Sequence, residues 1–343
     1  MRVAFDAQPT IGSATGIGEY ARELARALST TPGIELVPLS APKVDPWRFD
    51  RRAYWDQVLL PIAAARSKAK LLHCTSGTMP AIASLPIVLT LHDAAWLRVQ
   101  GHTRFYSRAY FGTLMKRLST HARAIITDSE FSAREIIELH PGIDERTMHV
   151  IPPGVAEEFG KLELRTNDRP SILVVGTVEA RKNLEVVIRA LPALPGVRTI
   201  SVGPSTPYRD HCAAIARELG VEERLEFRGY VERSELFDLY ATSTVLAMPS
   251  RYEGFGLPLA QARCVGLPAV SARGSSLDEI AGDIVPRIDP DDVAGWRDAL
   301  AAVFADPERA RRRAASDRAA AVERFSWRSA ADATAELYRI ASV

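Results

Sequence analysis

Short apolar runs rich in β-branched residues alternate with helix-like stretches along almost the whole chain. This alternation is typical of parallel sheets covered by helices, because two parallel strands need a long crossover connection. It predicts strands at residues 2–6, 70–73, 87–91, 124–127 and 149–151, and then at 171–176, 198–202, 225–227, 245–248 and 269–271. It predicts helices at residues 19–28, 129–139, 184–191 and 208–219. We therefore expect an α/β fold with two Rossmann-like units in tandem.

The length of the chain bears on its domain organisation. At 343 residues it exceeds what one hydrophobic core usually serves. A turn-rich cluster at 167–170, Asn-Asp-Arg-Pro, precedes the first strand of the second half. We predict an N-terminal domain at residues 1–166, a second domain at 167–325 and a final helical segment at 326–343.

The composition and net charge indicate which classes of partner and which cell compartment suit this chain. Apolar residues make up 47% and charged residues 25% of the chain, which is ordinary for a soluble globular protein. The formal net charge of +1 gives no support for bulk binding to nucleic acid. Three dispersed cysteines without metal-ligand spacing suit a reducing compartment. With no signal-peptide pattern at the start and no membrane-length apolar run, we predict a cytoplasmic protein.

The segment 252–258, YEGFGLP, is the strongest candidate for a binding site. It follows a predicted strand, contains two glycines and places a proline at the start of a helix. Such a turn directs backbone N–H groups toward one spot, which suits a phosphate or sugar hydroxyls. The carboxylate of Glu253 can accept hydrogen bonds from these hydroxyls. The alternative is a glycine-rich turn with a solvent-facing glutamate.

The segment 176–183, GTVEARKN, is the second candidate, because it follows the first strand of the second half. The adjacent cations Arg181 and Lys182 suit a diphosphate, and an arginine can bind two oxygens at once. Asn183 is a plausible N-cap of the next helix. The alternative is a solvated Arg-Lys pair on a turn.

Two weaker features follow predicted strands of the first half. His92 precedes Asp93 at the end of one strand, although a lone histidine there is commonly structural. The segment 15–20, TGIGEY, does not match GxGxxG, so it does not predict a dinucleotide site. Its glycines, including Gly16, would let a ligand approach the backbone at a helix start.

Together these features resemble the family 4 glycosyltransferases, a retaining family of GT-B architecture with two Rossmann-like domains facing each other across a cleft. The resemblance spans almost the whole chain and is nearest to bacterial mannosyltransferase-like members that act in polysaccharide or glycolipid assembly. It is carried by residues 16–20, 92–93, 128–132, 150–155, 181–184, 229–231, 253–258 and 325–327.

The resemblance implies a role for each candidate residue. Arg181 and Lys182 would hold the donor diphosphate and stabilise the leaving group. Glu253 would bind hydroxyls of the transferred sugar, and His92 would lie beside that sugar. Gly16 would shape the cleft floor, and Tyr230 and Val231 would lie near the nucleobase. The backbone of Phe255, Gly256 and Leu257 would contact the sugar and phosphate. Gln261 would stand at the ribose site. The final helix, from about Ser326, would cross back to the first domain.

One position departs from the family's pattern. The family has a second glutamate eight residues after the first, where it commonly binds the ribose, and this chain has Gln261. Glutamine still accepts a hydrogen bond, but the stronger charge-assisted bond is lost. This points to weaker donor binding, with altered donor choice or a degenerate paralogue as alternatives.

Two further segments bear on metals and membranes. Residues 289–292 contain a DxD, the metal signature of the other large glycosyltransferase architecture, but they precede a helix and are expected to form its cap. We expect no essential metal.

Residues 104–123 mix aromatic and basic residues, so a basic amphipathic helix could contact an anionic membrane. The alternative is a helix packed on its own sheet.

The predicted function is transfer of a hexose, with GDP-mannose as the first donor, to a hydroxyl of a saccharide or lipid-linked acceptor. The predicted partners are therefore a nucleotide-sugar and this acceptor, with no nucleic acid, and with peripheral contact at the inner face of the membrane left open. One alternative is a phosphorylase or sugar-nucleotide epimerase on the same architecture. Another is a non-catalytic sugar-nucleotide-binding subunit, suggested by Gln261.

Overall fold

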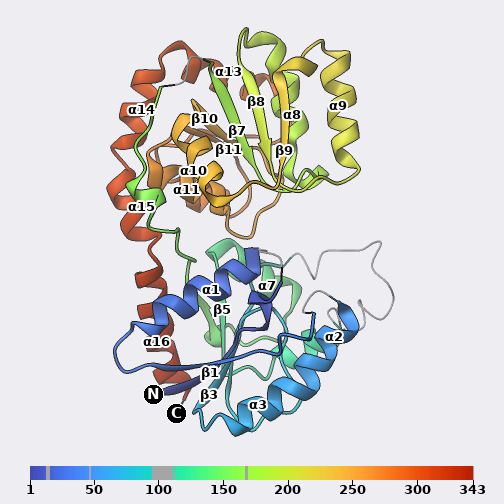
Figure 1. The fold of residues 1–343 in the computed structure, drawn as a ribbon, viewed down its shortest axis with the longest axis vertical. Coiled ribbons are helices and arrows are strands. Elements are labelled where there is room, and N and C mark those ends of the chain that lie inside the picture. Colours follow the sequence, from blue (N-terminus) through green and yellow to red (C-terminus); the bar gives the residue numbers. More distant parts are fainter. Residues whose placement is uncertain (13–15, 46–47, 95–109, 111–112, 167–168, 343) are drawn as a thin grey trace. The chain divides into compact units, whose positions relative to one another are not determined.

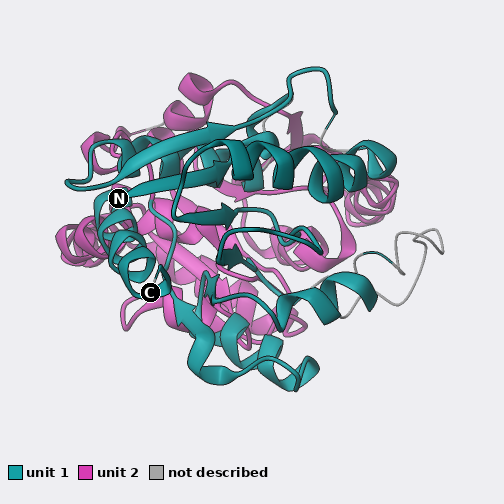
Figure 2. Ribbon diagram, turned by 90° about the horizontal axis from the view of Figure 1, so that it is seen from below, with its two compact units in different colours: residues 1–154, 326–343 teal, residues 155–325 magenta. Residues whose placement is uncertain are grey.

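The computed structural model describes residues 1–343 except 13–15, 46–47, 95–109, 111–112, 167–168 and 343. The chain divides into two compact units, coloured separately in Figure 2. Unit 1 comprises Met1–Gly154 and Ser326–Val343, and unit 2 comprises Val155–Phe325. Each unit has its own sheet and its own covering helices (Figure 1).

Unit 1 is built on a six-stranded parallel sheet in the order β2-β1-β3-β4-β5-β6. Its strands are β1 (Arg2–Asp6), β2 (Glu35–Leu39), β3 (Leu71–Cys74), β4 (Ile87–Thr90), β5 (Ala124–Thr127) and β6 (Met148–Val150). Its helices include α1 (Gly16–Ser29), α2 (Phe49–Tyr54), a π-helical segment (Trp55–Leu59), α3 (Leu60–Arg66), α6 (Met115–Ser119), α7 (Glu130–Leu139) and α16 (Trp327–Ala341). Every residue of β3, β4 and β5 is buried, as expected of parallel strands covered on both faces.

Unit 2 has a second six-stranded parallel sheet, in the order β12-β11-β10-β7-β8-β9. Its strands are β7 (Ser171–Val175), β8 (Arg198–Val202), β9 (Leu225–Gly229), β10 (Val245–Met248), β11 (Ala269–Ala272) and β12 (Arg287–Ile288). Its helices include α8 (Leu184–Ala190), α9 (Tyr208–Glu218), α10 (Arg233–Thr242), α11 (Leu257–Val265), α12 (Leu277–Ala281), α13 (Val293–Ala305), α14 (Pro307–Ala315) and α15 (Arg318–Arg324). The predicted α/β class with two Rossmann-like sheets is thus confirmed.

The strand order fixes where each sheet can bind a ligand. In unit 2 the chain runs outward from β7 through β8 to β9 on one side, and from β10 through β11 to β12 on the other. In unit 1 the corresponding reversal lies between β1 and β3. Open α/β sheets bind ligands outside the carboxyl ends of the strands at such a reversal. In unit 2 we therefore expect a ligand to bind at the loops after β7 and β10.

The C-terminal helix belongs to unit 1. Leu24 and Leu28 of α1 share one buried cluster with Leu337 and Tyr338 of α16. Ser326 is the N-cap of helix α16, because its hydroxyl accepts a hydrogen bond from the backbone N–H of Ser329 at 3.1 Å. The family resemblance implied a helix from about Ser326 that packs on the first domain.

The boundary between the units differs from the predicted one. It falls between Gly154 and Val155, twelve residues before the turn-rich cluster at 167–170. Val155 and Phe159 are buried in the core of unit 2, so their packing assigns this segment. The turn-rich cluster on which the prediction was based precedes the first strand of unit 2, but the chain already enters the core of unit 2 before it.

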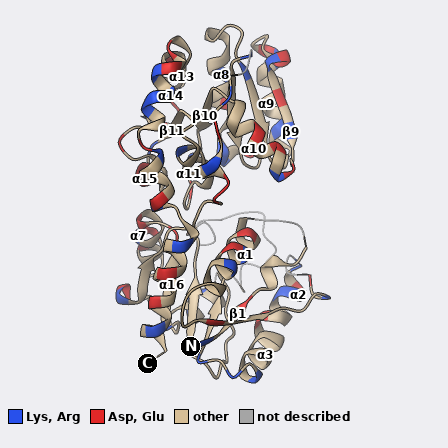
Figure 3. Ribbon diagram, turned by 60° about the vertical axis from the view of Figure 1, so that its left-hand side comes forward, with Lys and Arg blue, Asp and Glu red and all other residues tan. Residues whose placement is uncertain are grey.

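Residues 104–109 and 111–112 of the predicted amphipathic segment 104–123 lie outside the described residues, so a helix over the whole segment and its membrane contact stay predictions. Its described end forms α6, in which Met115 is buried. Within the described part of the chain, no helix is both long enough and apolar enough to cross a bilayer. Figure 3 shows basic and acidic residues interspersed over the helices of both units.

Candidate functional site

The loops after β7 and β10 are joined to each other in unit 2. The backbone N–H of Arg251 donates to the carbonyl of Arg181 at 2.9 Å, and the Arg251 guanidinium donates to the carbonyl of Ala180 at 3.0 Å. The amide of Asn183 donates to the carbonyls of Pro249, at 3.2 Å, and Pro290, at 2.7 Å. These bonds fix both loops at the strand reversal.

The predicted capping role of Asn183 is wrong in one respect. Asn183 occupies the N-cap position of α8, but its side chain makes no capping hydrogen bond. Its backbone is left-handed, with φ of 55°, and its buried amide binds the neighbouring loops instead. Asparagine tolerates this conformation better than most residues, which explains the residue type at this position.

Arg181, Lys182 and Glu253 form a joint ion-pair cluster at the strand reversal. The Lys182 ammonium lies 2.6 Å from one carboxylate oxygen of Glu253, and the Arg181 guanidinium lies 3.3 Å from the other. Arg181 also donates to the carbonyl of Tyr252 at 2.7 Å and pairs with Glu179 at 2.7 Å. Burial works against the charge of Arg181, but the two glutamates outweigh it and raise the pKa of Arg181. The structure thus brings together the three groups that the sequence assigned to the diphosphate and the sugar.

The glycine-rich turn opens α11 beside this cluster. Gly256 has φ of +96°, and a Cβ there would lie 2.5 Å from the Leu277 side chain, so only glycine fits. The Phe255 ring is buried and packs edge-on against Phe325 at 5.9 Å. Phe255 and Gly256 can therefore offer a ligand backbone groups only, and Leu257 begins the helix. The dipole of a helix N-terminus suits an anion, although Pro258 has no N–H and the Leu259 N–H already donates to the Gly256 carbonyl at 2.9 Å.

Gln261 lies one turn further along α11, and only 8% of it is exposed. Its side-chain carbonyl accepts a hydrogen bond of 2.8 Å from the hydroxyl of Tyr240, which α10 contributes. Burial raises the pKa of Tyr240 well above its usual value, so this phenol stays protonated and remains a donor. The partner of Gln261 within the protein was not foreseen from the sequence.

Tyr230 and Val231 follow β9 at the outer edge of the unit 2 sheet, also beyond a strand's carboxyl end. Tyr230 is 67% exposed, which is unusual for so large an aromatic side chain. An exposed ring at this edge is free to stack against a flat ligand such as a nucleobase.

In unit 1, His92 follows β4 and pairs with Asp128, which follows the neighbouring strand β5. The ring Nδ1 lies 2.8 Å from the Asp128 carboxylate, and Nε2 lies 3.2 Å from the carbonyl oxygen of Thr75. The ring of Tyr20, from α1, meets His92 edge-on at 4.6 Å. Gly16 begins α1 and is exposed, and a Cβ there would meet nothing within 4 Å.

The carboxyl end of β1 carries a buried charge cluster that the sequence analysis missed. Asp6 is fully buried, accepts a hydrogen bond from the Trp55 indole at 3.0 Å, and lies 3.8 Å from Arg52. Arg52 also pairs with Asp56 at 2.9 Å. Burial raises the pKa of Asp6 to about 6, although Arg52 lowers it. The position of Asp6 at the carboxyl end of the first predicted strand was the one sequence signal that could have indicated this cluster.

The aspartates of the DxD segment are engaged in local contacts. Asp292 caps α13 by accepting a hydrogen bond from the backbone N–H of Gly295 at 2.9 Å. Asp289 pairs with Arg273 at 3.1 Å, and Asp291 pairs with Arg251 at 2.7 Å. The predicted cap is confirmed. Among the described residues, no group of three or more His, Cys, Asp or Glu side chains is placed to hold a metal ion.

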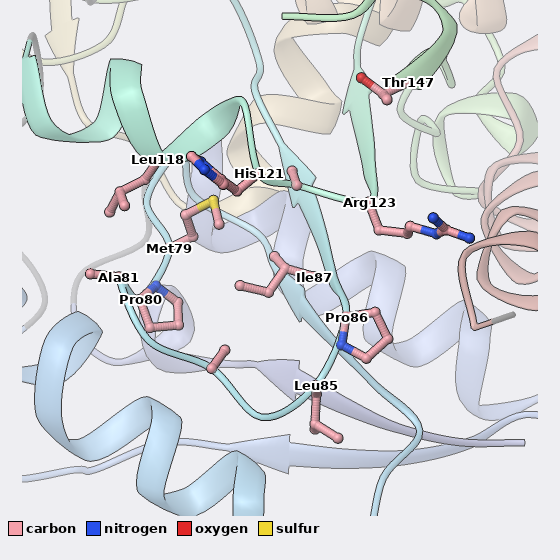
Figure 4. Close-up of a pocket in the computed structure, with 12 residues that line it drawn as sticks. Met79, Pro80, Ala81, Leu85, Pro86, Ile87, Leu118, His121, Arg123 and Thr147 are labelled. Carbon is pink, nitrogen blue, oxygen red and sulfur yellow. The ribbon is translucent and has the colours of Figure 1, made fainter.

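Two open cavities elsewhere on the molecule lie at the opposite ends of the strands. Figure 4 shows one of about 650 Å³ in unit 1, where Ile87 begins β4 and Arg123 precedes β5. Another, of about 540 Å³, includes Pro268 and Pro286, which precede β11 and β12. Because both lie at amino ends of strands, neither is the expected ligand position of an open α/β sheet.

Comparison with known proteins gives two adjoining family matches. Residues 14–159 match the model described as Glycosyltransferase Family 4, and residues 156–320 match the model described as Glycosyl transferases group 1. All the candidate residues lie within these two matches.

Among curated proteins, the chain is similar to D-inositol 3-phosphate glycosyltransferase of Xylanimonas cellulosilytica, with 34% identity over 63% of this chain and 56% of the relative. It is also similar to glycogen synthase of Mycobacterium tuberculosis, with 32% identity over 76% of this chain and 65% of the relative. The chain thus spans between about half and two thirds of the length of these relatives.

Solved structures share the fold over almost the entire chain. Sucrose-phosphate synthase of Thermosynechococcus elongatus superposes with a TM-score of 0.78, at 20% identity, over 98% of both chains. HepE of Anabaena, in complex with UDP and glucose, superposes with a TM-score of 0.76, at 18% identity, over 99% of both chains.

Proposed function

Because the chain belongs to the family 4 glycosyltransferases, with the GT-B fold, we propose that it transfers a hexose from a nucleoside diphosphate donor to an acceptor hydroxyl. The observation that carries the proposal is the cluster of Arg181, Lys182 and Glu253 at the strand reversal of unit 2. Two cations there suit a diphosphate, and one carboxylate suits sugar hydroxyls.

In this proposal the reaction retains the anomeric configuration. The diphosphate leaves from the face that the acceptor attacks, through an oxocarbenium-like state, and a donor phosphate oxygen takes the acceptor's proton. Arg181 and Lys182 stabilise the negative charge that develops on the leaving group, which is the electrostatic form of catalysis. Glu253 orients the sugar, and the exposed ring of Tyr230 stacks on the nucleobase.

The first donor to test is GDP-mannose, which the resemblance to mannosyltransferase-like members favours. UDP-glucose is the second, because HepE of Anabaena has been solved in complex with it. The acceptor is a saccharide or a lipid-linked saccharide.

A donor screen by thermal shift, followed by the mass of the product, tests this function. Release of nucleoside diphosphate only when an acceptor is present would support transfer and exclude a phosphorylase or an epimerase. Donor binding without turnover across a broad acceptor panel would instead support a non-catalytic subunit.

Transfer is expected to persist in excess EDTA. Arg181 and Lys182 already place two positive charges where the diphosphate would bind, so no metal is needed to neutralise it. The measurement is the initial rate before and after chelation. Loss of activity that Mg²⁺ or Mn²⁺ restores would contradict this expectation.

Gln261→Glu is expected to leave kcat unchanged and to lower the KM for the donor about fivefold, for a gain of roughly 1 kcal/mol. A carboxylate can keep the hydrogen bond from Tyr240 and offer its second oxygen to a ribose hydroxyl. Tyr240→Phe is the matched control, because it removes the internal partner without adding charge. Loss of donor binding in Gln261→Glu would show that this position serves another purpose.

A further inference from the structure

His92 lies between two groups that can only accept hydrogen bonds. The Asp128 carboxylate faces Nδ1 at 2.8 Å, and the carbonyl oxygen of Thr75 faces Nε2 at 3.2 Å. A neutral imidazole has one N–H and one lone pair, so one of its nitrogens would oppose an oxygen lone pair here. An imidazolium donates to both oxygens. The contacts therefore select the doubly protonated ring.

The surroundings favour the same protonation state. Burial lowers the pKa of His92, but the negative charge of Asp128, its hydrogen bond, the Thr75 carbonyl and Asp93 together raise it above the usual value. The outer oxygen of Asp128, Oδ1, is buried and has no hydrogen-bond partner within the described residues.

Two further titratable side chains of the described residues pack around the ring, and both are uncharged. Tyr20, from α1, has its pKa raised by burial and by Asp128, so it remains a neutral phenol. His73, from β3, has its pKa lowered to about 3, chiefly by burial, so it is a neutral imidazole near pH 7. Within the part of the chain that the structure describes, Asp128 and Asp93 are thus the charges that raise the pKa of His92.

We propose that Asp128 is a positioning residue that locks His92 as an imidazolium, so that His92 serves hexosyl transfer as a fixed cation and not as a proton acceptor. The catalytic half of this inference rests on the proposed function. Both N–H groups are held, which fixes the ring plane and the loop that leaves β4. An imidazolium has no lone pair with which to take the acceptor's proton.

The protonation state can be measured without turnover. In the full chain labelled with ¹⁵N-histidine, the His92 signals, assigned by their loss in His92→Gln, should report two protonated ring nitrogens at pH 7. Asp128→Asn should move their titration to lower pH, while Asp128→Glu should keep it high. Asp144→Asn, which removes an exposed unit 1 aspartate paired with Arg146, should change nothing. A neutral His92 at pH 7, or an unchanged titration in Asp128→Asn, would overturn the proposal.

Kinetics test the catalytic half. Asp128→Asn should lower kcat roughly 10-fold to 100-fold with little change in donor KM, the scale expected when a reacting group is misplaced. The alkaline limb of its pH–kcat profile should move to lower pH, and Asp128→Glu should restore part of the rate. An unchanged kcat and profile would refute the positioning role. Absence of transfer in the wild-type protein would refute the proposed function, while leaving the spectroscopic result valid.

Discussion

Arg181→Ala and Lys182→Ala are each expected to lower kcat by about 100-fold or more, while the thermal unfolding of the protein should stay close to wild type. Both cations belong to the loop after β7, outside the sheet core, and each contacts Glu253. In the proposed reaction their contacts strengthen as the diphosphate takes up negative charge. Removing one donor of this kind weakens the transition state more than the ground state.

Two exposed cations provide matched controls. Arg189 on α8 pairs with Glu185 at 2.8 Å, and Lys161 pairs with Glu157 at 3.2 Å. Their alanine variants also remove one charge from unit 2, but neither residue contacts the loops at the strand reversal. Steady-state rates at saturating donor should be lowered in the Arg181 and Lys182 variants and stay near wild type in the Arg189 and Lys161 variants. Near wild-type rates in both Arg181→Ala and Lys182→Ala would refute the diphosphate assignment.

The sequence predicted the central strands better than the edges of the sheets. The bounds of β1, β5, β8 and β10 agree with the predicted runs, because short apolar stretches flanked by polar residues mark strands buried on both faces. Strand β2 was missed because ELVPL contains a glutamate and a proline. Proline is tolerated on an edge strand, and β2 lies at the edge. Strand β12, at the other sheet's edge, has only two residues.

The sequence offered candidate site residues but gave no information on the contacts between them. It singled out Arg181, Lys182 and Glu253 from the loops in which they occur, but treated the cations and the carboxylate as binding separate parts of the donor. Their ion pairs depend on two loops about 70 residues apart meeting beside adjacent strands. The bond between Gln261 and Tyr240 depends in the same way on how α10 and α11 pack. Such tertiary contacts have no local sequence pattern.

Because Glu253 pairs with Lys182 and Arg181, its removal is expected to have opposite effects on turnover and on diphosphate binding. Glu253→Ala should lower kcat about 100-fold, because the reacting sugar loses a group that orients it. The same variant should bind the nucleoside diphosphate product at least as tightly as wild type. The Glu253 carboxylate lies 2.6 Å from the Lys182 ammonium and 3.3 Å from the Arg181 guanidinium, so an incoming diphosphate must share or displace these contacts. Removing the carboxylate removes a competing anion from both cations.

Kinetic titration of the donor and calorimetric titration of the nucleoside diphosphate measure the two parts separately. Glu253→Gln preserves the shape of the side chain and tests whether charge or size is responsible. Glu157→Ala, which removes an exposed carboxylate that pairs with Lys161, is the matched control and should change neither quantity. If Glu253→Ala alters neither turnover nor binding, Glu253 is only a turn residue and the site lies elsewhere. If it weakens diphosphate binding, the carboxylate holds the cations in place and does not compete for them.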